Sequence, residues 1–177
     1  GVMPYAGLEW ALLPVDVTLS VAVEYLAACL RDYPARLRSM APGDGWRIAT
    51  EPDTVLAAAV EAIEVDGLHA LKVIPEYAYR ADASQRIDDA AWRPFWDAVT
   101  ALDVPIFFTL GSTPGSTDPR QGFLDEVWRV ARWMDRYPDA VVSITHGFPW
   151  RDLIVGDGIE VPEAYWEPCR ARPSLSS

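Results

Sequence analysis

One of the two histidines in this chain stands at a position suited to proton transfer. His146 ends the apolar segment 140–146 (AVVSITH) and is followed by a glycine and a loop with aromatic and basic residues. Imidazole titrates near neutral pH, so a histidine at the end of a buried strand can serve as a general acid or base. The alternative is a histidine that caps the strand through hydrogen bonds. We favour the functional role, because ligands bind at strand ends in parallel α/β folds.

Lys72 is the only lysine in the chain, and it lies within the apolar segment 68–75 (LHALKVIP). A lysine in a buried strand either reaches out of the strand's end or gives up its charge. It would then bind an acid or act as a base, and the alternative is an ion pair with a carboxylate such as Glu76. If Lys72 points inward, alternation turns Leu71 and Val73 toward the helices, together with His69, which we interpret as structural.

Aromatic and basic residues follow two of the apolar segments. Tyr77, Tyr79 and Arg80 come after segment 68–75, and Trp150 and Arg151 come after His146. Such side chains can stack on a ring and clamp a carboxylate, although ordinary loop packing is the alternative for each. Four tryptophans at helical spacing are instead predicted to pack in the core: Trp92, Trp96, Trp128 and Trp133.

Several other patterns do not predict chemistry. The loop that begins at Gly111 resembles a phosphate cradle in composition, but it lacks the lysine and the glycine spacing of the phosphate-binding motifs. The acidic pairs Asp88-Asp89 and Asp125-Glu126 are interpreted as helix-start residues that stabilise the helix dipole. The sequence has neither a GxSxG nor an HExxH motif.

The elements that would position these residues alternate regularly. Apolar segments of strand type and segments with helical periodicity follow one another at near-constant spacing. The predicted strands are 8–15, 36–41, 68–75, 104–110 and 140–146, and the predicted helices are 20–33, 52–65, 88–102 and 121–137. The segment after Gly147 is weakly patterned, with one helical turn expected around Glu163.

This alternation predicts an α/β fold with parallel strands, since helical crossovers join the strands. Five strands suit either a small open sheet or a part of an eight-stranded barrel, which typically needs about 250 residues. The 177 residues are predicted to form one domain, because no linker divides them. An open sheet of the flavodoxin type, binding a nucleotide or flavin, remains a third-ranked alternative.

Composition excludes some classes of partner. A net charge of -11 and a pI near 4.5 argue against nucleic acid and anionic membranes, which need clustered basic residues. The two cysteines are far apart and form no metal-binding pattern, so a reducing cytoplasm is expected. No apolar run approaches the roughly 20 residues of a membrane span, and the start of the chain does not read as a signal peptide.

Five segments, in their order and spacing, resemble consecutive barrel strands of a known family. They are AGLEWALLPV, EYLAACLRDYPARL, DGLHALKVIPEY, WRPFWDAVTALDVPIFFTLG and YPDAVVSITHGFPW. The family is the amidohydrolase-related group that contains aminocarboxymuconate-semialdehyde decarboxylase and the hydroxybenzoate decarboxylases. The resemblance implies a parallel (β/α) barrel of TIM type, of which this chain would hold about five to six βα units.

The resemblance also implies a metal-dependent hydrolase or non-oxidative decarboxylase, usually with zinc or a similar divalent ion. The family's HxH pair and its last-strand aspartate lie in segments that this sequence does not contain. A further histidine ligand of the family aligns with Thr109, and a hydroxyl is a poor replacement for imidazole at zinc. The family's proton-transfer histidine aligns with His146.

Two hypotheses from different classes follow. The first is an amidohydrolase-related enzyme acting on a small carboxylated compound, with His146 as general acid/base and with Lys72 and Arg151 binding the carboxylate. The second is a non-catalytic α/β binding domain derived from the same scaffold. Since a barrel that lacks strands exposes sheet edges, we also expect a homo-oligomer or a piece of a longer chain.

Overall fold

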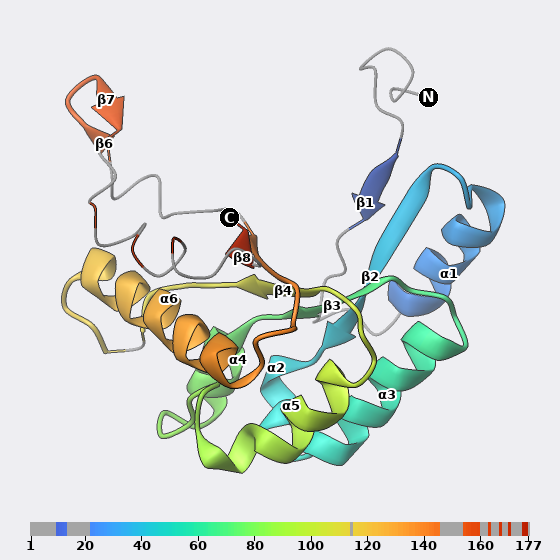
Figure 1. Ribbon diagram of the computed structural model, residues 1–177, viewed down its shortest axis with the longest axis horizontal. Coiled ribbons are helices and arrows are strands. Elements are labelled where there is room, and N and C mark those ends of the chain that lie inside the picture. Colours follow the sequence, from blue (N-terminus) through green and yellow to red (C-terminus); the bar gives the residue numbers. More distant parts are fainter. Residues whose placement is uncertain are drawn as a thin grey trace.

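The computed structural model describes residues 10–13, 22–113, 115–145, 154–159, 163, 167, 170 and 175–176. Its centre is a parallel sheet in the order β1-β2-β3-β4-β5-β8 (Figure 1). The strands are β1 (Ala11–Leu13), β2 (Leu37–Gly43), β3 (Ala70–Val73), β4 (Ile106–Thr109), β5 (Val142–Thr145) and β8 (Leu175–Ser176). Two further short strands, β6 (Ile154–Val155) and β7 (Gly158–Ile159), form an antiparallel pair.

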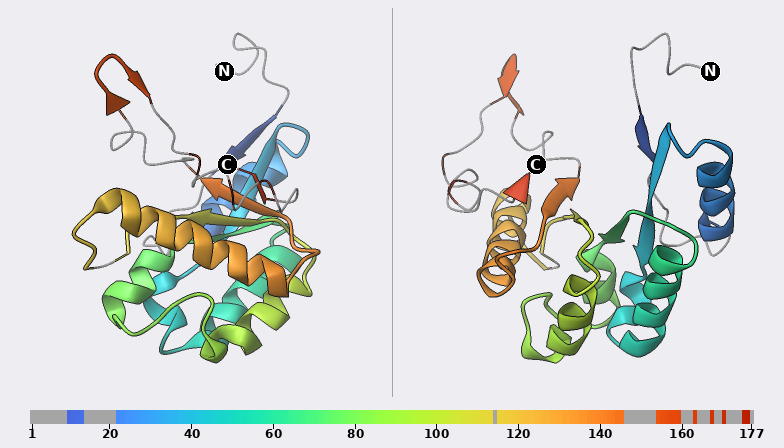
Figure 2. Two further views of the ribbon diagram at one scale, coloured as in Figure 1. Left: turned by 60° about the vertical axis from the view of Figure 1, so that its left-hand side comes forward. Right: turned by 45° about the vertical axis from the view of Figure 1, so that its right-hand side comes forward.

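Four helices cover the outer face of this sheet (Figure 2). They are α1 (Ala22–Asp32), α3 (Pro52–Glu64), α5 (Arg93–Thr100) and α6 (Pro119–Arg136), with a 3-10 turn, η1 (Ala90–Trp92), leading into α5. Two shorter helices, α2 (Gly45–Ile48) and α4 (Pro75–Ala81), follow directly on β2 and β3. Among the described residues, no helix is long and apolar enough to cross a membrane.

The strand order decides between the two architectures that the sequence left open. A doubly wound open sheet reverses its strand order and carries helices on both faces. From β1 to β5 the spatial order follows the chain without reversal, and α1, α3, α5 and α6 lie on one side of the sheet. The fold is therefore an incomplete parallel β/α barrel, as the family resemblance implied, and the flavodoxin-like alternative is wrong.

Proline and aspartate set where several helices begin. Prolines stand in the first turns of α3, α4, α5 and α6, where the missing N–H costs no hydrogen bond. Asp118 and Asp44 cap α6 and α2, since their side chains accept from the backbone N of Arg120 (2.9 Å) and of Trp46 (3.1 Å). Proline and aspartate therefore mark the first turns of these helices, of which α2 and α4 begin within two residues of a strand end.

The main core lies between the sheet and the outer helices, and aromatic rings fill much of it. Trp96 is 1% exposed and contacts the rings of Trp92, Phe108 and Trp133 at centroid distances of 5.3 to 5.8 Å. Its indole N–H donates to the carbonyl of Ile87 at 2.9 Å, so burial leaves that donor satisfied. The prediction that these tryptophans are core residues is confirmed for Trp92, Trp96 and Trp133, and Trp128 is half-buried.

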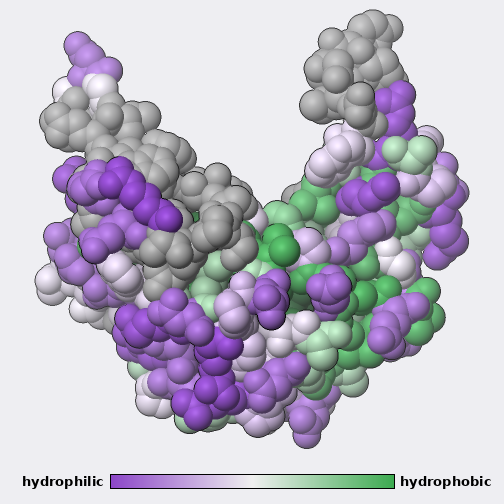
Figure 3. Space-filling model, viewed as in Figure 1, coloured by the Kyte–Doolittle hydropathy of each residue, from purple (hydrophilic) through white to green (hydrophobic). Residues whose placement is uncertain are grey.

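The inner face of the sheet has a separate, smaller apolar cluster. Met40 and Ala70 are buried there, with Leu12, Ile74 and Phe107 partly buried around them. Figure 3 shows apolar surface, in green, near the middle of this view. In a closed barrel this face would be the packed interior.

The structure corrects the sequence-based prediction at two connections. Residues after β2 and β3 were predicted to form loops, but α2 and α4 begin there, so Tyr77, Tyr79 and Arg80 lie on a helix. Both helices are too short for a hydrophobic period to be detected in the sequence. Glu163, around which a helical turn was expected, is itself helical, and its neighbours on both sides lie outside the described residues.

Candidate functional site

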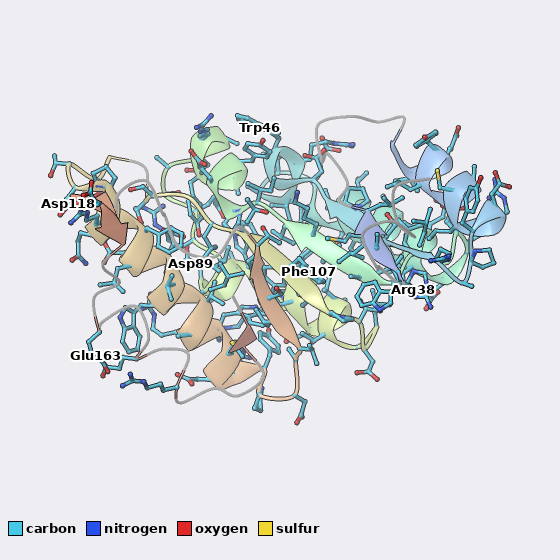
Figure 4. The ribbon with its side chains drawn as sticks, turned by 90° about the horizontal axis from the view of Figure 1, so that it is seen from above. Arg38, Trp46, Asp89, Phe107, Asp118 and Glu163 are labelled. Carbon is cyan, nitrogen blue, oxygen red and sulfur yellow. The ribbon has the colours of Figure 1, made fainter. Side chains whose placement is uncertain are left out.

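A row of side chains crosses the inner face of the sheet at the level of Lys72. Its members are register partners on four neighbouring strands: Pro42, Lys72, Phe107 and Ser143. Figure 4 looks onto this open face, with Phe107 near its middle. Leu71 and Val73 lie in the main core on the opposite face, as the predicted alternation requires. Lys72 is therefore directed to the open side.

Lys72 is half-buried, and its two cross-strand neighbours, Pro42 and Phe107, carry no charge. Within the described part of the chain, Lys72 makes neither an ion pair nor a hydrogen bond. The alternative ion pair with Glu76 is not formed, because Glu76 instead accepts from Arg80 at 2.5 Å. Lys72 is thus a cation on the open face that pairs with no acid among the described residues.

Two hydroxyls lie on the same face, nearer to the carboxyl ends of the strands. Thr109 and Thr145 are the last residues of β4 and β5, and their Oγ1 atoms are 2.5 Å apart. Thr109 is two residues beyond Phe107 and Thr145 two beyond Ser143, so both share the face of Lys72. Thr109 was singled out in the sequence, but Thr145 was not. The signal that would have found Thr145 is its place at the end of a strand, two residues after Ser143 on the same face.

Helix α4 brings a further predicted residue to this edge of the sheet. Tyr77 stacks on Trp46 of α2, with ring centroids 5.1 Å apart and planes 14° from parallel. Trp46 was missed by the sequence analysis, although it lies three residues after the end of β2. Tyr79 is 2% exposed and belongs to the core, so the idea that it contacts a ligand is wrong. Arg80 is exposed and forms an ion pair with Glu76.

The start of α4 also touches the loop that follows β4. A Cβ placed on Gly111 would lie 2.7 Å from Oε2 of Glu76, so the Glu76 carboxylate covers this glycine. The loops after β3 and β4 are therefore in contact at the carboxyl edge, beside Thr109. Ligands of β/α barrels bind at this edge, because the loops and the helix N-termini converge there.

Glu126 corrects another prediction. It was interpreted as a helix-start residue, but α6 begins at Pro119, and Glu126 is 2% exposed in the third turn. Burial raises the pKa of its carboxyl, with opposing effects from Thr113, Tyr79 and Arg129. Burial next to this carboxyl also raises the pKa of the Tyr79 hydroxyl. The other acidic pair of that prediction does lie at a helix start, since Asp89 is at the N-cap position of η1, and Asp88 beside it binds Arg129 and Arg132.

Three of the predicted site residues, His146, Trp150 and Arg151, lie outside the described residues. His146 follows Thr145 in the sequence, directly after the end of β5. The other histidine, His69, precedes β3 at the amino end of the sheet and is exposed. Burial and the nearby Arg38 hold the pKa of His69 below its ordinary value. Its location is consistent with the structural role predicted for it.

The donor set at the described strand ends does not fit a divalent metal. Thr109 and Thr145 offer neutral hydroxyls that already bond to each other. Among the described residues, no group of three or more His, Cys, Asp or Glu side chains is arranged to hold a metal ion. Two carboxylates at this edge are already engaged, since Glu76 pairs with Arg80 and Asp44 accepts from the backbone N–H of Trp46.

A hollow of about 500 Å³ lies at the opposite end of the sheet, at the amino ends of β4 and β5. Its polar residues include Asp97 and Tyr137, and the Tyr137 hydroxyl donates to Asp97 at 2.7 Å. We place the candidate site at the carboxyl edge despite this hollow. The amino end of a β/α barrel serves stability, and Lys72 and the two threonines lie on the open face that leads to the other end.

Comparison with known proteins identifies relatives by structure alone. No protein-family model matches the sequence, and no curated protein matches it either. Solved structures do match, with TM-scores above 0.6. They are decarboxylases, and this chain spans about half the length of the first of them, which it covers to 53%.

Three of these structures illustrate the match. The 2,6-dihydroxybenzoate decarboxylase from Rhizobium is 17% identical over 81% of this chain, with a TM-score of 0.63. The 5-carboxyvanillate decarboxylase from Novosphingobium aromaticivorans is 18% identical over 80% of this chain and 47% of its own, with a TM-score of 0.61 and bound manganese. A dihydroxybenzoic acid decarboxylase from Polaromonas, also with manganese, is 18% identical over 95% of this chain and 63% of its own, with a TM-score of 0.63. The parallel β/α barrel that the sequence segments suggested is thereby confirmed as the fold.

Proposed function

We propose that this chain is part of an amidohydrolase-type enzyme, a carboxy-lyase or a hydrolase, that acts on a small carboxylated aromatic compound. The observation that carries the proposal is Lys72, a cation on the open face of the barrel sheet that pairs with no acid within the described part of the chain. Its fold is that of enzymes which remove a carboxylate from an aromatic ring. A cation facing such a site suits the negative charge of the substrate.

In the proposed reaction, Lys72 binds the carboxylate and Tyr77 contributes to an aromatic wall against the ring. Trp150 and Arg151 are proposed as further binding residues from the segment after β5. Arg80 is included as well, although it would have to leave Glu76 to reach an acid. In decarboxylation the carbon–carbon bond breaks, CO₂ departs, and the ring carbon keeps the electron pair and takes a proton from His146. In hydrolysis His146 would instead accept a proton from water.

A metal would supply Lewis-acid stabilisation of the developing charge in a complete family member. The described donors of this chain do not fit one, so no step of the proposal uses it. The proposal treats residues 1–177 as one partial-barrel domain in the cytoplasm. It includes self-association, because β1 is an edge strand of the sheet formed by the described residues, beside an apolar inner face. Light scattering on the purified chain tests that part, and a monomer at micromolar concentration would contradict it.

The chain offers a matched control for the role of His146, since it has only two histidines. The assay follows loss of 2,6-dihydroxybenzoate or 5-carboxyvanillate together with CO₂ release. We expect His146→Gln to lower turnover by about 10²-fold or more, the usual loss when a general acid is removed. His69→Gln should leave turnover unchanged, because His69 lies at the amino end of the sheet.

Two results would remove the proposal. Equal turnover in wild type and His146→Gln would dismiss the acid/base role. Saturable binding of the acids with no turnover in wild type would favour the non-catalytic binding domain instead. Each result is interpretable only if both variants unfold at the wild-type temperature, which circular dichroism checks.

A further inference from the structure

Glu126 is a buried carboxyl group that the proposed chemistry does not use. Its side chain is 3% exposed, and its Oε1 accepts from the hydroxyl of Thr113 at 2.6 Å and from Nε of Arg129 at 3.2 Å. Thr113 belongs to the loop that begins two residues after Thr109, the last residue of β4. A buried acid of helix α6 is therefore hydrogen-bonded to the loop at the carboxyl edge of the sheet.

The loop is held to α6 at a second point. The Thr113 backbone N–H donates to the carbonyl of Gly122 at 3.2 Å, and the Thr113 hydroxyl lies 3.1 Å from the same carbonyl, a longer contact than its 2.6 Å bond to Glu126. Within the loop, the Ser116 N–H donates to the Thr113 carbonyl at 3.0 Å. A Cβ on Gly122 would collide with the side chain of Ser112 and lie 2.8 Å from Cβ of Ser116. The loop thus packs on the helix so closely that only glycine fits beneath it.

The other oxygen of Glu126 is unusual. Within the described part of the chain, Oε2 is buried and has no hydrogen-bond partner. An unpaired buried polar atom is costly, and an apolar residue of similar volume would remove that cost. Glu126 nevertheless places at this position a group that accepts from the Thr113 hydroxyl. Packing alone does not explain that choice.

We propose that Glu126 is a positioning residue for the candidate site, holding Thr113 and the loop residues next to it that the structure describes against α6, so that Thr109 and Gly111 keep their places at the carboxyl edge. The role given to Glu126 rests on the proposed function, whereas the contacts that hold the loop to α6 do not depend on that function. Glu126 touches no substrate-facing group itself. It acts through Thr113 and the loop.

The same arrangement makes the loop responsive to pH. The groups that face Glu126 are Thr113 from the loop, Tyr79 from α4, Arg86 before η1 and Arg129 from α6. Arg129 in turn contacts Asp88 at 3.4 Å, and Arg86 lies over the Tyr79 ring at 5.0 Å. Because burial raises the pKa of Glu126, the closed loop favours the neutral acid. Opening the loop hydrates the acid and lowers that pKa, so closure weakens as pH rises from the ordinary glutamate range through the raised value.

The test is amide hydrogen exchange of the full chain without substrate, read on peptides covering 110–118. Glu126→Met and Thr113→Val remove the acceptor and the donor at nearly constant volume. We expect amide exchange at this loop to accelerate roughly tenfold in both variants, because each loses one charge-assisted or buried hydrogen bond. Glu126→Gln keeps an acceptor, so the protection factors of the loop amides should stay near those of wild type but no longer change with pH. Thr113→Ser keeps the hydroxyl donor, so it should retain the protection that Thr113→Val loses.

The control peptide covers residues 42–48 at the same edge of the sheet, where no described residue touches Glu126. Unchanged exchange in both Glu126→Met and Thr113→Val would overturn the proposal. Equal acceleration in the control peptide would also overturn it, since that marks global loosening. Exchange in Glu126→Gln that keeps the wild-type pH dependence would remove Glu126 as the pH-sensitive group. Because no substrate is present, a failed turnover assay leaves these results intact.

Discussion

Gly45 is the point at which α2 touches the end of β3, and replacing it with alanine tests the construction of the carboxyl edge. The new Cβ would lie 2.7 Å from the carbonyl oxygen of Ile74 and 2.9 Å from Cβ of Tyr77. Both are fixed atoms at the junction of β3 and α4, so one helix must move. Overpacking of this kind costs about 1–3 kcal/mol, against a gain of at most about 1 kcal/mol in helix propensity.

We therefore expect Gly45→Ala to destabilise the chain by about 1–2 kcal/mol, which lowers the unfolding temperature by roughly 2–8 °C for a chain of this size. Thermal unfolding followed by far-ultraviolet circular dichroism measures the shift. Tryptophan fluorescence reports separately on the stack of Trp46 and Tyr77, because their rings lie only 5.1 Å apart.

Gly111→Ala is the matched control. Its Cβ would meet Oε2 of Glu76 at 2.7 Å, but that atom ends a flexible side chain that can swing away. The cost is then only the exposed ion pair with Arg80, worth about 0–1 kcal/mol. If Gly45→Ala unfolds at the wild-type temperature, or if Gly111→Ala costs as much, the close approach of α2 to the β3 end is refuted.

Three further predictions concern the core, the buried acid and the metal. Trp96→Ala should cost about 3–5 kcal/mol in urea unfolding, because it empties the centre of the aromatic cluster and frees the Ile87 carbonyl; a loss below that of an exposed substitution such as Trp10→Ala would contradict the packing. The free energy of unfolding of wild type should fall relative to that of Glu126→Gln as pH rises above 4.5, the ordinary glutamate pKa, since the native pKa of Glu126 is raised. A wild type that gains stability relative to Glu126→Gln as pH rises would contradict this prediction. Purified chain should hold less than stoichiometric zinc or manganese by plasma mass spectrometry, and chelator should not shift its unfolding temperature, because the described strand ends lack a ligand set.

The strands and long helices could be predicted from the sequence because their signals are local. Segment 68–75 contains β3, and segment 121–137 overlaps α6 to within two residues at its start. The family resemblance added what periodicity lacks, since five alternating strands fit both a barrel and an open sheet. Spatial strand order is a tertiary fact, and no local pattern encodes it.

Parts of the candidate site were beyond the sequence for physical reasons. Glu126 looks like any acid near a helix start, and only the packing of the Thr113 loop on α6 makes it buried and tied to the strand edge. Trp46 follows a Pro-Gly-Asp-Gly run that reads as a turn, although Asp44 caps a short helix there. Lys72 was found because a lone lysine in an apolar strand conflicts with its surroundings, and such conflicts mark functional positions.

The central claim is that Lys72 presents a free charge to a carboxylate on the open face of the barrel sheet. Calorimetric titration of the full chain with 2,6-dihydroxybenzoate tests it most directly, with Lys72→Arg and Lys72→Met as a pair that separates charge from shape. We predict saturable binding by wild type, weaker binding by Lys72→Arg, and a loss of at least about tenfold in Lys72→Met. Equal affinity of wild type and Lys72→Met would contradict the account.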